Sequence, residues 1–315
     1  MRTSAVIVHW GPVAPTVDLT RRLSVLPQIN DVIVVANDLR ERPDDVDDTV
    51  IWIVPSRNLG FGGGFRHACG TVSVPDCYLL LNNDVRLESA TIDACLDLLA
   101  RPDVGIVGPT LVNAGGLYPG VTGLTSVFAV PRRRRTPTDH ADDVPWVTGA
   151  IMFIKAECHQ QVPMHIRYFL YYEDLDLCLR ARRAGWRVLI SPAQAWHTGG
   201  GSVPSDVSAY YPARNRLWFA RTHGRPRQVA LAAAWLFLAE LPRSAFSRLV
   251  HRREARSIAQ LRHALRGAVD GIGPMPDADS MLADEPRTAR WASTAGGVAR
   301  PPHPRAGQHS VVSRR

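Results

Sequence analysis

Apolar and polar positions alternate in blocks along the first two thirds of the chain. Short runs rich in Val, Ile and Leu predict buried strands at residues 5–9, 31–36, 50–54, 78–81, 104–107, 146–155 and 186–190. Helical spacing of apolar residues predicts helices at residues 18–26, 88–100 and 173–184, with Pro27 and Gly185 ending the first and the last. Strands that alternate with helices in this way predict an α/β fold with a parallel, doubly wound sheet. The last strand is expected to stop at Ser191 and Pro192.

Three segments depart from this pattern. Residues 113–143 are rich in Gly, Pro and Arg, which predicts a mobile excursion. The apolar run at residues 229–239 has eleven residues, too few to span a bilayer, which requires about 20. It suits a helix lying on an anionic membrane surface or one packed on the preceding α/β domain, and the sequence leaves both open. The Pro-rich tail from residue 274 is expected to be disordered. We therefore divide the chain into residues 1–225, 226–273 and 274–315.

Composition indicates a net positive charge and a reducing compartment. The chain of 315 residues is 45% hydrophobic and 21% charged, as in ordinary globular proteins, and its formal net charge is +8. Residues 221–266 hold ten Arg against Glu240 and Glu254, which suits membrane headgroups, nucleic acid or a phosphorylated lipid. Five scattered cysteines without a Cys-x-x-Cys motif argue against a disulfide framework or zinc site. The first apolar run is too short for a signal peptide, so we expect a cytoplasmic protein.

One strand leads directly into a candidate metal motif. The run at residues 78–81 is followed by Asn82, Asn83 and Asp84. In an open α/β sheet, ligands bind at the carboxyl ends of strands, and a diphosphate can complete the shell of a divalent cation held there. His197, before a glycine run, is a further candidate ligand. A simple strand and turn, with a structural histidine, is the alternative.

Two other motifs carry candidate chemistry. Four glycines between residues 60 and 64 allow close approach of the backbone to a phosphate or sugar at a helix start, or form only a flexible loop. The motif lies too late in the chain for a dinucleotide fingerprint. Glu173, Asp174 and Asp176 crowd the first turn of a predicted helix. They can serve as capping charges, or one of them can act as a general base.

Together and in this order, the motifs resemble family 2 glycosyltransferases, close to the bacterial rhamnosyltransferase-like group. The resemblance covers residues 4–225 and rests on the segments 58–64, 82–84, 149–150, 172–177, 183–186, 197–202 and 214–215. It implies a GT-A type fold: a Rossmann-like, mostly parallel sheet flanked by helices, here with a C-terminal helical extension.

The resemblance also implies a mechanism. A nucleotide-diphosphate sugar would bind the N-terminal half, with its diphosphate on Mg²⁺ or Mn²⁺. Asp84 would be the firmest metal contact, with Asn82 and His197 as further ligands. Asp174 would accept the proton of an acceptor hydroxyl that attacks the anomeric carbon from the opposite face, which inverts its configuration. On the acceptor side lie Gly149 and the acids Glu173 and Asp176, which would orient the acceptor or the helix.

Donor recognition follows the same resemblance with some departures. The donor-binding candidates are Asn37, Asp38, Asn58, Gly60, Gly63, Arg66 and Asn83. Ala36 replaces a usual Asp, so recognition of the base is expected to shift to Asp38, and Arg66 replaces a common Asn. Deoxythymidine-diphosphate rhamnose is the first expected donor, with uridine-diphosphate sugars next. The acceptor is a hydroxyl of a glycan, a lipid-linked molecule or a metabolite, and the enzyme is expected to work on the inner face of the membrane.

Two other functions compete with this interpretation. A sugar-phosphate nucleotidyltransferase would carry a Gly-rich, basic loop directly after the first strand, where this chain has His9-Trp10-Gly11-Pro12. A non-catalytic basic module would bind a membrane or nucleic acid in a salt-sensitive way and would not turn over a donor. The ordered motifs argue against both, and nucleic acid is not the expected partner.

Overall fold

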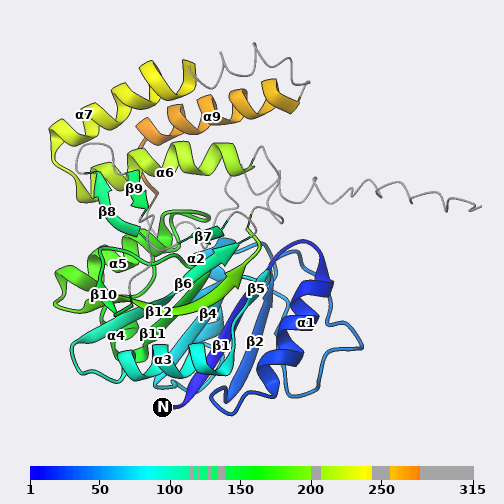
Figure 1. Cartoon of the computed structure of the whole chain (residues 1–315). Helices are drawn as coiled ribbons and strands as arrows, with labels where there is room; N and C mark the ends of the chain where they lie inside the picture. Colours follow the sequence, from blue (N-terminus) through cyan, green and yellow to red (C-terminus); the bar gives the residue numbers. More distant parts are fainter. Residues whose placement is uncertain are drawn as a thin grey trace, which may run out of the picture.

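A mixed, mostly parallel sheet forms the centre of the protein (Figure 1). The computed structural model describes residues 1–113, 116–118, 121–125, 130–133, 139–199, 207–242 and 256–276. The strand order is β10-β12-β6-β11-β4-β1-β2-β3. These strands are β1 (Thr3–His9), β2 (Asp31–Ala36), β3 (Ile51–Ile53), β4 (Cys77–Leu81), β6 (Val104–Asn113), β10 (Asp142–Asp143), β11 (Ile151–Lys155) and β12 (Arg187–His197).

The direction of the strands gathers the polar motifs at one edge. β1 pairs in parallel with β2 and β4, and β6 pairs in parallel with β12. β11 lies antiparallel between β4 and β6, so that β4 and β6 point the same way. The carboxyl ends of β1, β2, β4 and β12 therefore meet along one edge of the sheet. This confirms the predicted α/β class, with β11 as an antiparallel insertion.

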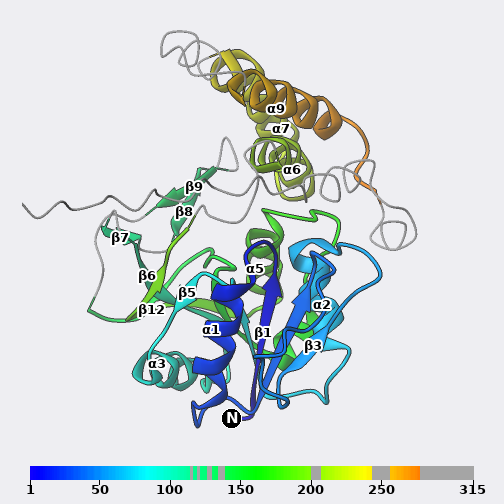
Figure 2. The same ribbon diagram turned by 90° about the vertical axis from the view of Figure 1, so that its right-hand side faces the viewer.

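Helices cover both faces of the sheet (Figure 2). Alternate residues of β1 enter opposite cores, as the two-residue period of a strand requires: Val6 and Val8 on one face, Ala5 and Ile7 on the other. The first face is covered by α2 (Gly60–Cys69), α4 (Ala156–Gln161) and α5 (Glu173–Arg183). The second is covered by α1 (Val13–Ser24) and α3 (Ser89–Leu99).

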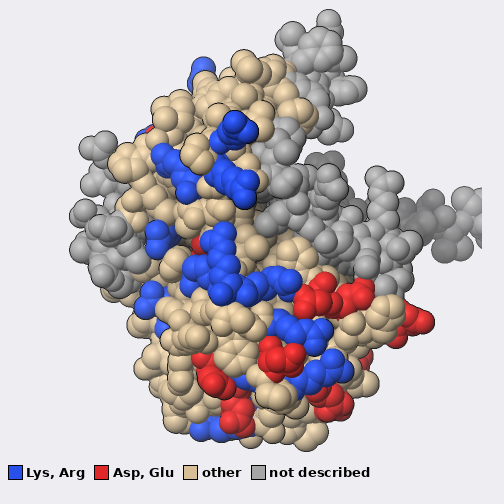
Figure 3. All heavy atoms as spheres, turned by 90° about the vertical axis from the view of Figure 1, so that its left-hand side faces the viewer, with Lys and Arg blue, Asp and Glu red and all other residues tan. Residues whose placement is uncertain are grey.

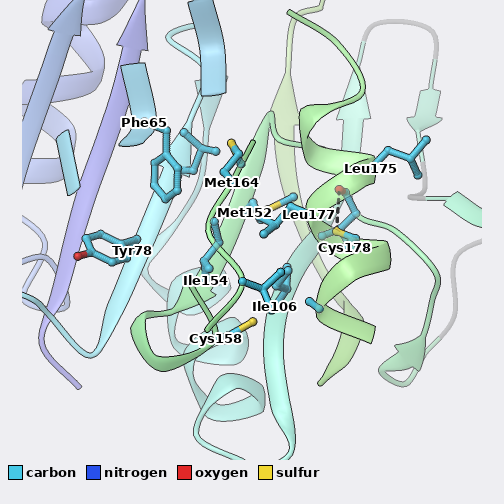
Figure 4. Packing of buried hydrophobic residues seen from close by; sticks show 14 of the residues in the cluster. Phe65, Tyr78, Ile106, Met152, Ile154, Cys158, Met164, Leu175, Leu177 and Cys178 are labelled. Carbon is cyan, nitrogen blue, oxygen red and sulfur yellow. Dashed lines mark hydrogen bonds between the residues drawn. The ribbon is translucent and has the colours of Figure 1, made fainter. Parts of the chain in front are cut away.

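The helix α5 is packed firmly on the sheet. Figure 4 shows Leu177 and Cys178 directed at the side chains of Ile106 and Met152. The Cys178 thiol also lies 3.8 Å from the carbonyl oxygen of Val147. These contacts hold the acidic first turn of α5 at a defined place beside the sheet.

A layer of further helices lies over the carboxyl edge of the sheet (Figure 1). It contains α6 (Val207–His223), α7 (Pro226–Trp235), the π-helix η1 (Leu236–Glu240) and α9 (Arg256–Ile272). Their shared core is built from Ala213, Leu217, Ala220, Ala232, Leu236, Leu241 and Ala268. The predicted boundary at residue 225 falls between α6 and α7, although α6 packs with the later helices. Within the described ranges, no helix combines the length and apolarity needed to cross a membrane.

Several local predictions differ from the structure. Strand β12 continues past Ser191 and Pro192 to His197, because its pairing with β6 shifts register between Ser191 and Gln194 and leaves room for a proline. The 113–143 excursion includes β7 (Gly116–Tyr118), which extends the sheet, and a hairpin of β8 (Val121–Thr125) with β9 (Val130–Arg133). Of the predicted strand at residues 146–155, only β11 forms. The tail beyond residue 276 lies outside the described residues.

Candidate active site

Asp84, His197 and Asn82 converge at the carboxyl ends of β4 and β12. The His197 Nε2 atom lies 3.3 Å from Asp84 Oδ1 and 3.4 Å from the Asn82 side-chain amide. Asp84 and His197 meet because the short strand β5 (Val85–Arg86) pairs with the last two residues of β12. The Gly199 N–H also donates to Asp84 Oδ2 at 3.1 Å. The structure thus unites all three predicted metal ligands.

The donor set at this point fits a hard divalent cation. Burial alone would raise the pKa of Asp84, but the hydrogen bond and charge of His197 lower it, so that the carboxylate is ionised. His197 Nε2 cannot at once donate to Asp84 and accept from Asn82, so only one of these two contacts can be a hydrogen bond in a given tautomer. A cation would accept lone pairs from each of them. Within the described ranges, no three His, Cys, Asp or Glu side chains form a metal cluster. An ion here would therefore need oxygens from a substrate or from water.

Asp174 is held beside this group by backbone donors. Its Oδ2 accepts a hydrogen bond from Gly149 N–H at 2.8 Å, and its Oδ1 accepts one from Leu175 N–H at 2.7 Å. The neighbouring Ala150 carbonyl accepts from Asn82 N–H at 3.0 Å, which links the metal motif to the base. Burial raises the pKa of Asp174, although these donors oppose the rise. A partly exposed carboxylate with a raised pKa is suited to accept a proton.

Helix α6 supports the loop that carries Asp174. Just before α5, Phe169, Tyr171 and Tyr172 adopt left-handed backbone conformations with φ of 66°, 68° and 76°, which are unfavourable for such side chains. The buried Asn215 amide of α6 donates to the carbonyls of residues 168, 170 and 171 at 3.0, 2.8 and 2.8 Å. Arg214 donates to the first of these carbonyls at 2.7 Å. This pair therefore holds a strained loop in place.

The three acids of the first turn of α5 have different surroundings. Glu173 is buried, and burial together with the charge of Asp174 raises its pKa well above the ordinary value. Its Oε2 has no hydrogen-bond partner among the described residues. Asp176 is fully buried. Of these acids, Asp174 alone is both partly exposed and held by Gly149.

Asp176 is the centre of a buried polar cluster. Its carboxylate lies 2.9 Å from His165 Nδ1, 2.8 Å from His223 Nε2 and 2.7 Å from Arg180 Nε. Burial would raise the pKa of Asp176, but these partners lower it strongly. Because His223 belongs to α6, the cluster ties α5 to the helical layer. Asp176 was expected to orient the acceptor or the helix, and the partners that surround its carboxylate here belong to the protein itself.

The glycine-rich motif is built against the same loop. Asn58 Oδ1 accepts from Gly60 N–H at 2.8 Å, which starts α2. Gly60 has φ of 71°, and an added Cβ would lie 2.3 Å from the Phe169 carbonyl oxygen. That oxygen accepts from Phe61 N–H at 2.7 Å. The Asn37 amide group bridges the Gly60 carbonyl and the backbone N–H of residue 59. Glycine is therefore required at residue 60, where the glycine-rich motif meets the loop that precedes α5.

A second polar network lies at the ends of β1 and β2. His9 Nε2 lies 3.2 Å from Asp38 Oδ2, and His9 Nδ1 lies 2.7 Å from Thr16 Oγ1. Asn83 donates to the Thr16 hydroxyl at 3.1 Å. Burial would raise the pKa of Asp38, whereas His9 lowers it. Asp38 thus remains an ionised hydrogen-bond acceptor at the ends of β1 and β2.

Some of the predicted donor-binding residues are not presented to a ligand at the strand ends. Arg66 lies in the last turn of α2, about 9 Å along the axis from Gly60. The preceding residue, Phe65, packs against Tyr78 at the start of β4 and against His159 of α4, with ring centroids 5.8 and 5.1 Å apart, so Arg66 lies near the opposite end of the sheet. The position of Arg66 therefore does not support its expected contact with the donor. The amides of Asn37 and Asn83 are directed into the protein, and Gly63 is buried in α2.

The sequence interpretation missed the residues that act behind this site. His9 and Thr16, and the histidines around Asp176, were assigned no role. Arg214-Asn215 was recognised only as a matching motif. The position of His9 at the end of a predicted strand is a signal by which it could have been found. The other residues could not be found in this way, because their partners lie on distant segments of the chain.

Comparisons with known proteins give a family model and curated relatives similar in sequence to this chain. Residues 23–239 match a family model described as "Glycosyltransferase like family 2". An N-acetylglucosaminyl-diphospho-decaprenol L-rhamnosyltransferase of Mycobacterium tuberculosis is 27% identical over 192 residues, which span 50% of this chain and 62% of that protein. The low-salt glycan biosynthesis hexosyltransferase Agl10 of Haloferax volcanii is 24% identical over 152 residues, which span 43% of this chain and 47% of that protein.

Two crystal structures share the fold. GalNAc-T7 with UDP, GalNAc and Mn²⁺ superimposes with a TM-score of 0.56 at 12% identity, over 83% of this chain and 54% of the other. S. aureus TarS 1-349 superimposes with a TM-score of 0.50 at 12% identity, over 94% of this chain and 88% of the other. These similarities confirm the GT-A type architecture.

Proposed function

Because the chain belongs to the family 2 glycosyltransferases, whose family model matches residues 23–239, we propose an inverting sugar transfer from a nucleotide-diphosphate donor to a hydroxyl acceptor. Rhamnose linked to deoxythymidine diphosphate is our first choice of donor, followed by uridine-diphosphate sugars. The mycobacterial relative, named as a rhamnosyltransferase acting on a diphospho-decaprenol compound, supports this donor and a lipid-linked acceptor. We further propose that the enzyme works from the cytoplasmic side.

The observation that carries the proposal is the link between Asp174 and the Asp84–His197 pair. Gly149 holds the Asp174 carboxylate, and the next residue, Ala150, accepts a hydrogen bond from Asn82 N–H. The adjacent residues Gly149 and Ala150 thus connect the candidate base to the candidate diphosphate site through one hydrogen bond each. This is the arrangement that a single displacement needs, with the acceptor on one side of the anomeric carbon and the leaving group on the other.

The chain's own groups account for the steps of the reaction. The Asp174 carboxylate takes the proton of the acceptor hydroxyl as its oxygen forms a bond to the anomeric carbon. The bond from that carbon to the phosphate oxygen breaks, and the nucleoside diphosphate leaves with the electron pair. Asp84, His197 and Asn82 would hold Mg²⁺ or Mn²⁺. The bound ion would supply Lewis-acid stabilisation of the negative charge on the leaving diphosphate. The Mn²⁺ found with GalNAc-T7 supports this cofactor.

Thermal shift with a panel of nucleotide-diphosphate sugars, with and without Mn²⁺, tests the donor site. A donor at a hundred times its Kd should stabilise the protein by about 2.7 kcal/mol. We expect one donor to do so only with Mn²⁺, and Asp84→Ala to abolish the shift. Asp97→Ala, at an exposed position of α3, is the matched control and should keep it. A donor shift that survives Asp84→Ala would contradict the assignment of the metal site.

Turnover of that donor tests the base separately. Asp174→Asn preserves the size of the side chain and removes the proton acceptor, so donor binding should persist while transfer falls by at least about a hundredfold. Transfer at the wild-type rate by a folded Asp174→Asn protein would refute the assignment of the base. The linkage in the product, determined by NMR, reports whether the configuration is inverted.

A further inference from the structure

Two exposed apolar stripes run along the outer helices of the helical layer. On α9 the exposed residues are Ile258, Leu265, Val269 and Ile272, at 60%, 48%, 55% and 59% exposure. On α7 and η1 they are Leu231, Trp235 and Leu238, at 44%, 38% and 79%. Intervals of seven, four and three residues place the α9 set on one face of that helix, and Leu231 and Trp235 lie one turn apart on α7, with Leu238 following in η1. Single exposed apolar residues are common, but two such stripes on helices that share one core indicate an interaction surface.

The stripes are not part of the core of the helical layer. That core uses other faces of the same helices, through Ala232 and Leu236 of α7 and η1 and Ala268 of α9. The packing of α9 on α6 is close, because an added Cβ at Gly267 would lie 2.2 Å from the Tyr210 carbonyl oxygen. Each helix therefore has one apolar face for its neighbours and a second that remains exposed. For residues 229–239, one face packs within the helical layer, and the exposed face is the one to which the membrane alternative applies.

Basic side chains flank the stripes. Arg262 and Arg266 are exposed on α9, on the side of the stripe away from its buried face, and Arg225 and Arg227 are exposed at the start of α7. Figure 3 shows Lys and Arg over the upper, helical part of one face, and Asp and Glu on the lower part together with further Lys and Arg. The segment from residue 221 to 266 carries a net charge of +8. A second copy of this chain would place like charges against each other, whereas an anionic bilayer matches both the charge and the apolar stripes.

We propose that the outward side of α7, η1 and α9 docks on an anionic lipid bilayer. The apolar side chains enter the boundary between headgroups and acyl chains, while the arginines meet lipid phosphates. In this position α6 lies between the bilayer and the sheet. Because Asn215 of α6 holds the loop before Asp174, the base is on the side of the sheet that faces the helical layer. The docking stands on the surface alone, and its use in presenting a lipid-linked acceptor rests on the proposed function.

Flotation of the full chain with vesicles tests the proposal. We expect binding to phosphatidylcholine vesicles with 30% phosphatidylglycerol and much weaker binding to phosphatidylcholine alone. The combined variant Leu231→Gln, Leu238→Gln, Val269→Gln and Ile272→Gln should bind at least about tenfold more weakly. The matched control is Val25→Gln with Val74→Gln, at two exposed apolar positions of the catalytic part, and should bind like the wild type. Far-UV circular dichroism and thermal unfolding verify that each variant is folded.

Two further measurements separate insertion from simple charge attraction. Replacing Arg262 and Arg266 by Gln should weaken binding to the anionic vesicles by on the order of tenfold. Brominated lipids should quench part of the tryptophan emission, and Trp235→Phe should remove most of that quenching. Binding without quenching, or with no loss in the four-residue variant, would overturn the apolar contact.

Other outcomes also decide the matter. Absence of wild-type binding to anionic vesicles would overturn the proposal. A wild-type dimer that the four-residue variant converts to a monomer, with no lipid binding by either, would assign the stripes to an interface between copies. Thermal shift by the soluble donor is measured on every variant and should be unchanged. A failure of lipid docking is thereby distinguished from a failure of the transferase assignment.

Discussion

Replacing Asn215 by Ala should destabilise the protein and slow transfer, although the residue touches no substrate in our proposal. The side chain is fully buried and supplies the donors for carbonyls of the left-handed loop before α5. After truncation, the Tyr168 carbonyl retains Arg214 as a donor, but the Leu170 and Tyr171 carbonyls lose theirs. Arg214 Nε also loses its acceptor, Asn215 Oδ1, at 2.9 Å.

The magnitude follows from these lost contacts. A buried group left without its partner costs about 1–3 kcal/mol, and water can reach the partly exposed carbonyls, so we expect a loss of about 2–3 kcal/mol. Helix propensity acts the other way, because Ala favours a helix over Asn by up to about 0.7 kcal/mol. For domains of this size, 1 kcal/mol shifts Tm by about 2–4 °C, so Tm should fall by about 4–12 °C.

Thermal and urea unfolding give the stability, and steady-state kinetics give the function. We expect kcat to fall because the loop that positions Asp174 relaxes, while KM for the donor changes little. Asn215→Asp is the decisive control, since it preserves size but replaces the donor by an acceptor facing carbonyls. It should be at least as destabilising as Asn215→Ala. Wild-type stability within about 0.5 kcal/mol for either variant would refute the reasoning.

Three more predictions follow from the site. Gly60→Ala should destabilise the protein by more than about 2 kcal/mol in urea unfolding, because it adds left-handed strain and a clash with the Phe169 carbonyl. Gly70→Ala, with φ of −85° and no close neighbour, is its control and should be neutral or slightly stabilising. Since the pKa of Asp174 is raised above 3.8, kcat/KM should increase as pH rises through that higher value, and a pH-rate profile with its midpoint at or below 3.8 would contradict this. The same shift means that the native carboxyl binds its proton more tightly than the unfolded one, so this group's contribution to stability falls as pH rises through this interval. Chelation by EDTA should abolish both donor-dependent thermal stabilisation and turnover, and added Mn²⁺ should restore them.

The sequence by itself determined the architecture and the order of the motifs. Buried strands and amphipathic helices leave a local periodicity that can be read without knowing the partners. The parallel arrangement then places the ends of parallel strands at a common edge, so the position of Asn82 and Asp84 at that edge was predictable. The glycine motif at residues 60–64 predicted a close backbone approach, and at Gly60 the partner of that approach is the Phe169 carbonyl of the same chain.

The tertiary structure alone decided which polar groups meet. His197 reaches Asp84 because β5 pairs with the end of β12, and the extension of β12 through Pro192 depends on a register shift that local sequence does not reveal. The distinction between Asp174 and Asp176 depends on the phase of α5 and on partners from Gly149, which precedes β11, and from His223 of α6. The orientation of a side chain depends on contacts between residues far apart in the chain, whereas the periodicity of burial depends on residues close together in the sequence. The partners of each side chain at this site therefore followed only from the tertiary structure, whereas the fold class followed from the pattern of apolar and polar residues.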